Sequence, residues 1–157
     1  MDDHIRIIDQ TLLPSELKII EIRTAAQAVD AIQRLAIRGA PALGAFGSLA
    51  LVVALDEYHS KSLNEAISHL ESCRVSIGDA RPTAVNLRWA VDRVIDRAIA
   101  RSSDLENLRD NLLREAHLVA AEDAEACAEI GRLGRELLRD AVVIGTHCNA
   151  GRLATAG

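Results

Sequence analysis

The stretch from Pro41 to about Tyr58 limits what this chain can fold into more than any other feature. It is apolar around the whole circumference of a helix, which is typical of a helix buried on several sides. Small and polar residues interrupt the apolar run, so it is shorter and less apolar than a membrane-spanning helix. Gly44, Gly47 and Ser48 share one face, and glycines in this pattern favour close packing against another helix over ligand contact. We therefore expect a helix at the centre of a bundle.

Further segments show helix-start signals and apolar residues at helical spacing. In two of them a threonine or serine is followed by glutamine or glutamate three residues later, which is the pattern of a capping box. The expected helices run from Ala25 to Ile37 after Thr24, from Ser62 to about Cys73, from a Thr83 cap to about Ala98, and from Ser103 to a break near Gly131 and Gly134. A loop is expected at residues 75–82. These helices and the central one make a bundle of about five members.

Strand patterns occur at both ends of the chain. Ile5–Ile8 and Leu17–Ile22 are short β-branched runs on either side of Pro14, which predicts an antiparallel hairpin. Val142–Ile144 is followed by small and polar residues, which predicts a strand, a turn and the start of a helix in a parallel α/β sheet. The expected fold is mainly α, with a hairpin and helical domain at residues 1–140. Residues 141–157 are the expected stub of an α/β domain whose remainder the chain lacks.

Composition and charge disfavour several classes of function. Apolar residues make up 49% of the 157 residues, which suits a single-core globular domain rather than a disordered or membrane protein. The net charge of −5 and the interspersed basic residues disfavour a nucleic-acid or anionic membrane surface, so a small molecule or a protein is the expected partner. The acidic start at Asp2 and Asp3 lacks the order of a secretory signal, which predicts a cytoplasmic protein.

The cysteines and histidines do not form a recognisable metal motif. Cys73, Cys127 and Cys148 are odd in number and widely spaced, which disfavours a disulfide framework and a structural zinc site. The five histidines contain no H-E-x-x-H pattern, so we expect no catalytic metal. A lone cysteine is most often a small hydrophobe, but Cys148 lies between a strand end and a helix start, where a thiolate would be stabilised. His147 is adjacent and should point away from the sulfur, so a Cys–His dyad is not expected.

Two arginines are candidates for binding an anion. Arg38 and Arg81 each stand just before an expected helix, in R-G-A-P-A and A-R-P-T-A-V-N-L. A guanidinium beside the free N–H groups of a helix start suits phosphate or carboxylate. The more common role is an ion pair that ties a loop to a nearby carboxylate, and spacing alone favours that role.

Four ordered motifs in this chain resemble those of methylthioribose-1-phosphate isomerase. They are I-D-Q-T-L-L-P at Ile8–Pro14, I-R-G-A-P-A-L-G at Ile37–Gly44, A-R-P-T-A-V-N-L at Ala80–Leu87, and T-H-C-N-A-G-R-L-A-T-A-G at Thr146–Gly157. The motifs span nearly the whole chain and match the N-terminal part of that enzyme. The family shares a superfamily with ribose-1,5-bisphosphate isomerases and the regulatory subunits of the initiation-factor nucleotide exchange factor.

This resemblance implies roles for particular residues. Cys148 would be catalytic, and the substrate would be held by Arg38 with the adjoining Gly39 and Ala40, and by Arg81. The family pairs its cysteine with an aspartate in a Rossmann-like domain, and this chain ends before such a residue. Arg152 departs from the family, which usually has a small residue there.

The resemblance also implies an activity and an assembly. The expected reaction converts 5-methylthioribose 1-phosphate to the ketose in methionine salvage, without metal or cofactor, in a homodimer. The ring must open and hydrogen must move from C2 to C1, so two acid/base groups are needed, and we expect the chain by itself to be inactive. The alternatives are a ribose-1,5-bisphosphate isomerase and a non-catalytic regulatory module of the exchange-factor type.

Overall fold

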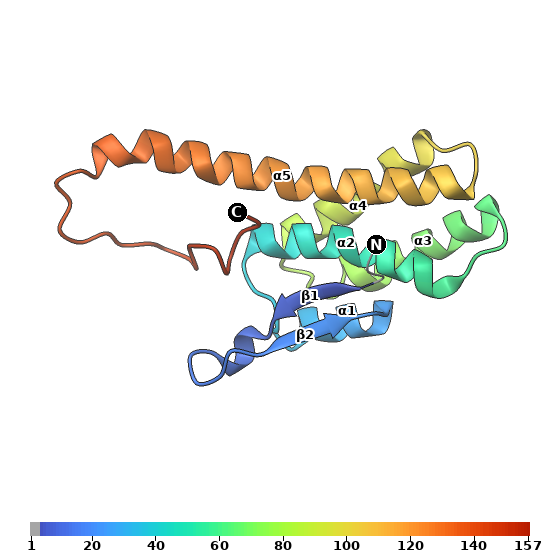
Figure 1. The fold of residues 1–157 in the computed structure, drawn as a ribbon, viewed down its shortest axis with the longest axis horizontal. Coiled ribbons are helices and arrows are strands. Elements are labelled where there is room, and N and C mark those ends of the chain that lie inside the picture. Colours follow the sequence, from blue (N-terminus) through green and yellow to red (C-terminus); the bar gives the residue numbers. More distant parts are fainter. Residues whose placement is uncertain (1–3) are drawn as a thin grey trace.

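The computed structural model describes residues 4–157 as a two-stranded hairpin followed by five α-helices (Figure 1). The hairpin pairs β1 (Ile5–Ile8) with β2 (Ile19–Ile22) in an antiparallel register that sets Ile5 opposite Ile22, and a short 3-10 helix, η1 (Gln10–Leu12), follows β1. The helices are α1 (Ala25–Gln33), α2 (Ala40–Tyr58), α3 (Leu63–Gly78), α4 (Val85–Ala100) and α5 (Leu105–Leu137). The predicted mainly helical fold and the N-terminal hairpin are confirmed.

The core of the protein surrounds α2, which contacts all four other helices. Its length and apolarity would suit a membrane span, but 72% of its apolar window is buried inside the protein, as expected for a core helix. A Cβ on Gly47 would lie 2.4 Å from Leu87 Cδ1, and one on Gly44 would lie 3.1 Å from the carbonyl oxygen of Asn86. The glycine face of α2 is therefore where α4 packs closely, as the sequence predicts.

Both predicted capping boxes form. The Gln27 N–H donates to Thr24 Oγ1 at 3.1 Å, and the Glu65 N–H donates to Ser62 Oγ at 3.3 Å. In each case the glutamine or glutamate side chain reaches back to the N–H group just before the cap residue. Two other predicted helix starts are wrong. The α4 helix begins after Ala84 with no side-chain cap, and α5 is capped by Asp104 rather than Ser103.

Three helix ends also differ from the sequence-based expectation. The α1 helix ends at Gln33 instead of Ile37, because Leu35 has a φ of +66° and both Ala36 and Ile37 donate to the carbonyl of Ala31. The α3 helix continues to Gly78, into the first half of the loop predicted at residues 75–82. The α5 helix runs through Gly131 and Gly134 to Leu137. Each glycine costs only about 1 kcal/mol relative to alanine, which a long helix tolerates.

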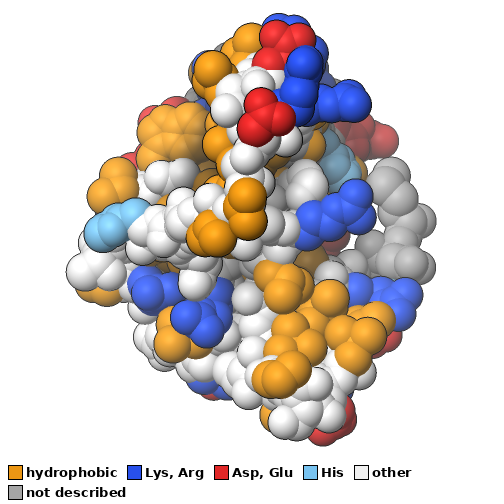
Figure 2. Space-filling model, turned by 90° about the vertical axis from the view of Figure 1, so that its left-hand side faces the viewer, with side chains coloured by type: hydrophobic (Ala, Val, Ile, Leu, Met, Phe, Trp, Pro, Cys, Tyr) orange, Lys and Arg blue, Asp and Glu red, His pale blue; other side chains and the backbone are white. Residues whose placement is uncertain are grey.

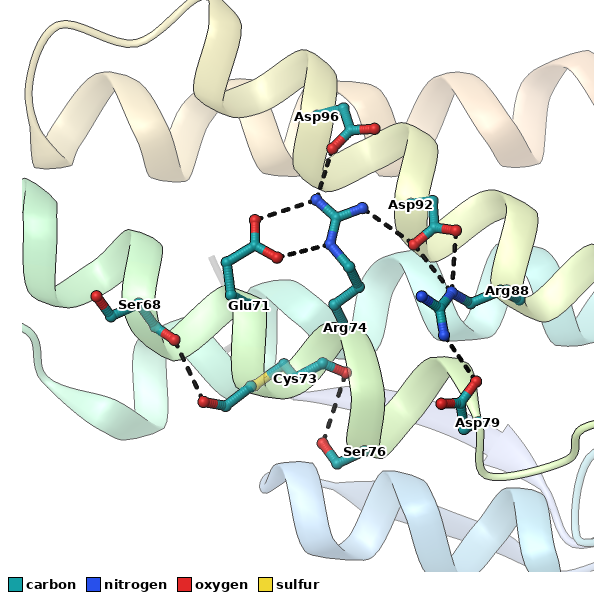
Figure 3. Close-up of polar contacts among 10 residues, drawn as sticks. Ser68, Glu71, Cys73, Arg74, Ser76, Asp79, Arg88, Asp92 and Asp96 are labelled. Atoms are coloured by element: carbon teal, nitrogen blue, oxygen red, sulfur yellow. Dashed lines mark hydrogen bonds and ion pairs between the residues drawn. The ribbon is translucent and has the colours of Figure 1, made fainter.

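Ion pairs join α3 to α4 and explain why α3 extends beyond Cys73 (Figure 3). Arg74, on this last part of α3, pairs with Glu71 on its own helix and with Asp92 and Asp96 on α4, at N–O distances of 2.5–3.0 Å. Arg88 on α4 pairs with Asp92 on its own helix and with Asp79, the C-cap residue of α3. These pairs, together with the buried Ile77, hold the additional turn of α3 against α4.

The end of the chain does not form the predicted strand. Val142, Val143 and Ile144 are 97%, 85% and 61% exposed, and they pair with no strand among residues 4–157. Only turns follow Cys148, where a helix start was expected. The Rossmann-like continuation is therefore not present within the described residues. Instead, the segment after α5 turns back and brings the C-terminus beside the start of α2 (Figure 1).

Candidate active site

A cavity of about 700 Å³ lies where three distant parts of the chain meet. One part is the connection between β1 and β2, the second is Arg38 before α2, and the third is the segment after α5 that contains Cys148. Hydrophobic and basic side chains predominate on this end of the molecule (Figure 2). The cavity is lined by Gln10, Leu13, Pro14, Arg38, Thr146, Cys148, Asn149, Ala150, Leu153 and Ala154.

The wall formed by the hairpin connection is fixed by Asp9. This carboxylate is 5% exposed and accepts hydrogen bonds from the N–H and the hydroxyl of Thr11 and an ion pair from Arg34, at 2.7–3.1 Å. The hydrogen bonds from Thr11, together with the guanidinium of Arg34, lower the pKa of Asp9. The main chain of Gln10 donates to the carbonyl of Ala36, which ties the turn to the loop after α1. The I-D-Q-T-L-L-P motif therefore forms a fixed wall.

The start of α2 receives the C-terminal segment directly. The Ala42 N–H donates to the carbonyl of Ala154 at 3.2 Å. Gly39 has a φ of +94°, and a Cβ there would lie 2.3 Å from the Ala154 oxygen, so only glycine allows this approach. Ala40 follows as the first residue of the helix. Because Ala154 occupies the Ala42 donor, the predicted anion site at this helix start has one N–H group fewer than expected.

Cys148 is the exposed thiol among the three cysteines. Cys73 is buried inside the bundle, and burial raises its pKa to about 11, with a smaller contribution from Glu57. Cys127 is partly buried on α5. Thr146 Oγ1 donates to the carbonyl of Cys148 at 3.0 Å, which shapes the turn that presents the thiol to the cavity. His147 does not line the cavity.

The structure brings together some of the predicted substrate-binding residues and not others. Arg38 is exposed and lines the cavity with Cys148, and its guanidinium has no hydrogen bond or ion pair within residues 4–157. Arg81 lies in the α3–α4 connection, where its carbonyl accepts from the Ala84 N–H, and it does not line the cavity. Arg152 does not line the cavity either. Gln10 lines the cavity but was not predicted as a site residue. The available signal in the sequence was the I-D-Q-T-L-L-P motif that contains it.

The chemical character of the cavity follows from its lining. It combines one thiol, one guanidinium and the neutral amides of Gln10 and Asn149, with apolar surface from Leu13, Pro14 and others. No carboxylate or imidazole lines it, and no group of three or more potential metal ligands occurs in the part of the chain that the structure describes. This arrangement suits a small anionic ligand beside an exposed thiol.

Residues 36–156 match the model of the initiation factor 2 subunit family, which is more than half of the chain. The chain belongs to the initiation factor 2 subunit family. Relatives in this family include a methylthioribose-1-phosphate isomerase from Acetivibrio thermocellus, 41% identical over 96% of this chain and 44% of its own length. The predicted resemblance to methylthioribose-1-phosphate isomerases is confirmed at this level.

Two solved structures of the family share the fold of this chain. The 5-methylthioribose 1-phosphate isomerase of Pyrococcus horikoshii OT3 is 32% identical with a TM-score of 0.88, and the match covers 99% of this chain and 44% of that one. A structure titled as the translation initiation factor eIF-2B, subunit delta, from A. fulgidus is 41% identical with a TM-score of 0.89, covering 99% and 45%. The chain thus spans less than half the length of these relatives.

Proposed function

We propose that the whole protein isomerises 5-methylthioribose 1-phosphate to 5-methylthioribulose 1-phosphate. The observation that carries the proposal is the meeting of Cys148 and Arg38 on one cavity, in a chain about 40% identical to a relative named as this isomerase. A homodimeric, cytoplasmic enzyme with a Rossmann-like domain after residues 1–140 is part of the same proposal, and it rests on the family resemblance.

In this proposal Arg38 binds the phosphate of the substrate. Its guanidinium is exposed at the cavity and is not committed to a carboxylate within residues 4–157, so two of its N–H donors are available for phosphate oxygens. The N–H groups near Gly39 and Ala40 add to the positive end of α2. We keep Arg81 as a second proposed contact, on the family resemblance alone.

Cys148 supplies one of the two acid/base groups. Hydrogen must move between C2 and C1 of the opened sugar while a second group handles the ring and C2 oxygens, and each positioned group contributes about 100- to 10,000-fold. The cavity lining contains no carboxylate or imidazole for the second role. We therefore assign the second role to a group outside this lining, and the family resemblance suggests an aspartate.

A chimera tests the proposal directly. Residues 1–157 would be fused to the part of the Pyrococcus horikoshii isomerase that follows its matched region, and ketose formation would be followed on methylthioribose 1-phosphate. Because the two chains share a fold over 99% of this one, we expect a cooperatively melting protein that turns the substrate over. A chimera that melts cooperatively but forms no ketose contradicts the proposal.

The same chimera distinguishes the proposed function from two alternative functions. Ribose 1,5-bisphosphate carries a second phosphate, and Arg38 is the one basic residue in the cavity lining, which favours the singly phosphorylated sugar. The regulatory-module alternative draws on the family description and on the eIF-2B title of one structural relative. Preferred turnover of the bisphosphate would support the first alternative, and binding of sugar phosphate without any turnover would support the second.

A further inference from the structure

The segment that follows Cys148 is fastened to two side chains that lie far away in the sequence. Gln10 Nε2 donates to the carbonyl of Leu153 at 2.9 Å, from the hairpin connection. The N–H of Ala156 donates to Asp123 Oδ2 at 2.7 Å, on α5. Neither of these side chains belongs to the element that carries Cys148, so both hold the segment from outside.

The main chain of α2 gives a third point of attachment. The Ala42 N–H holds the carbonyl of Ala154, which is 4% exposed, whereas every residue from 135 to 153 is exposed. From residue 142 onward, these three are the hydrogen bonds that reach another element within the described chain. The exposed part of the segment therefore depends on them for its position.

Cys148 is connected to these attachments by a short closed turn. The Ala154 N–H donates to the carbonyl of Gly151 at 2.9 Å, and the φ of +94° at Gly151 turns the chain. Asn149 and Ala150, between this turn and Cys148, are exposed. A shift of the turn would therefore be passed on to Cys148.

Both anchoring side chains come from fixed parts of the molecule. The turn that contains Gln10 is held by main-chain hydrogen bonds from Asp9 to Lys18 and from Gln10 to Ala36. Asp123 follows Glu122, which forms a two-pronged ion pair with Arg93 on α4 at 2.5 and 2.6 Å. Each anchor is therefore placed by contacts that do not involve the cavity.

We propose that Gln10 and Asp123 are positioning residues, which hold residues 153–156 against the bundle and thereby keep Cys148 on the same cavity as Arg38. The consequence for catalysis rests on the proposed isomerase function, whereas the fastening of the segment does not. Misplacing a reacting group by about 1 Å can lower a rate about 100-fold, so such anchors control turnover through the position of Cys148.

Three variants test the proposal on the protein of 157 residues. Gln10→Met keeps a side chain of similar length but has no N–H donor and no charge, so the bond to the Leu153 carbonyl is lost without a carboxylate entering the cavity that Gln10 lines. Asp123→Ala removes the acceptor for the Ala156 N–H. Asp123→Asn keeps a carbonyl oxygen in the same position and is the matched control.

Amide hydrogen exchange at Ala42 is the first readout. The bond from the Ala42 N–H to the Ala154 carbonyl involves neither of the substituted side chains, so a change in exchange reports on the segment as a whole. If the segment is held jointly, exchange at Ala42 should become about threefold or more faster in both Gln10→Met and Asp123→Ala, and stay near the original rate in Asp123→Asn. Circular dichroism should show an unchanged helix content. Unchanged exchange at Ala42 in both variants would overturn the proposal.

Kinetics of the active chimera are the second readout. We expect Gln10→Met and Asp123→Ala to lower kcat about tenfold with little change in KM, and Asp123→Asn to keep kcat within about twofold of the original value. An equal loss in Asp123→Asn and Asp123→Ala would overturn the positioning role. Faster exchange in a protein that converts no sugar phosphate would support the fastening and count against the isomerase function alone.

Discussion

At the scale of single residues, the three cysteines have three different environments in the structure. Cys73 is buried and its pKa is raised to about 11, so it stays a thiol at neutral pH. Cys127 is partly buried on α5, and Cys148 is exposed and lines the same cavity as Arg38. A nucleophilic or acid/base thiol must be accessible, so Cys148, which is exposed and lines the same cavity as a guanidinium, is the cysteine suited to that role.

We predict that Cys148→Ser abolishes turnover of the active chimera, with little loss of substrate binding. An alkoxide is far harder to form than a thiolate, so the serine cannot take over the proton transfer. Steady-state kinetics on methylthioribose 1-phosphate would measure the effect, and Cys127→Ser is the matched control, because Cys127 does not line the cavity. More than about a tenth of the original kcat in Cys148→Ser would exclude the proposed catalytic role.

We predict that Arg38→Ala raises KM about tenfold and changes kcat only slightly, because a charged hydrogen bond to phosphate is lost. Arg152→Ala is the control, since Arg152 is near Cys148 in sequence but does not line the cavity. It should change KM less than twofold. An unchanged KM in Arg38→Ala would leave this arginine without a part in binding. The same measurement on Arg81→Ala would test the role that the family resemblance assigns to it.

At the scale of elements, context decides whether a glycine ends a helix, forms a contact or does neither. Gly131 and Gly134 lie inside α5 with no atom within 4 Å of an added Cβ, and the helix continues past them. Gly47 in α2 faces Leu87 of α4 at a distance that leaves no room for a methyl group. The same residue type is therefore neutral to packing in one helix and required by packing in another.

We predict that Gly131→Ala and Gly134→Ala each stabilise the C-terminal half of α5 by about 0.5–1 kcal/mol, because alanine loses less backbone entropy in a helix. Hydrogen exchange of the α5 amides should slow accordingly.

We predict that Gly47→Ala instead lowers the midpoint of thermal unfolding, since the new methyl group would displace Leu87 from a packed core. A stabilised Gly47→Ala protein would contradict the close packing of α2 and α4.

At the scale of the whole molecule, the hairpin, the helical bundle and the C-terminal segment converge on one cavity. Asp9 joins the hairpin to the helical bundle. Its carboxylate forms an ion pair with Arg34, which caps the end of α1, and its main-chain N–H donates to the carbonyl of Lys18 before β2. Gln10 and the start of α2 then hold the third. The site is therefore a product of long-range contacts, and its order depends on the stability of the whole fold.

We predict that acid weakens the fold partly through Asp9. Its pKa is lowered in the folded protein, so its contribution is fully present above the unfolded value of about 4 and is lost as the pH falls through the folded pKa. The free energy of unfolding would be measured with urea at pH 7 and at pH 3. It should fall less between these two pH values in Asp9→Asn than in the original protein. Glu21 and Glu122 also have lowered pKa values, so part of the acid effect should remain. An identical difference in both proteins would exclude Asp9 as a source.

The sequence by itself determined the elements whose signals are local. Apolar residues at helical spacing placed the five helices, and the side chains of Thr24 and Ser62 accept from N–H groups only three residues away, so their caps were predictable. The all-round apolarity of residues 41–58 identified the core helix, and the motifs around Arg38 and Cys148 identified two residues that meet on the cavity.

Tertiary structure alone decided what depends on contacts between distant residues. The left-handed Leu35 ended α1 early, and ion pairs with α4 extended α3. A strand at residues 142–144 needs a neighbouring strand for its hydrogen bonds, and without one among residues 4–157 the segment stays exposed despite its β-branched sequence. Gln10 reached the site through a hydrogen bond to a residue 143 positions away, which no local pattern records.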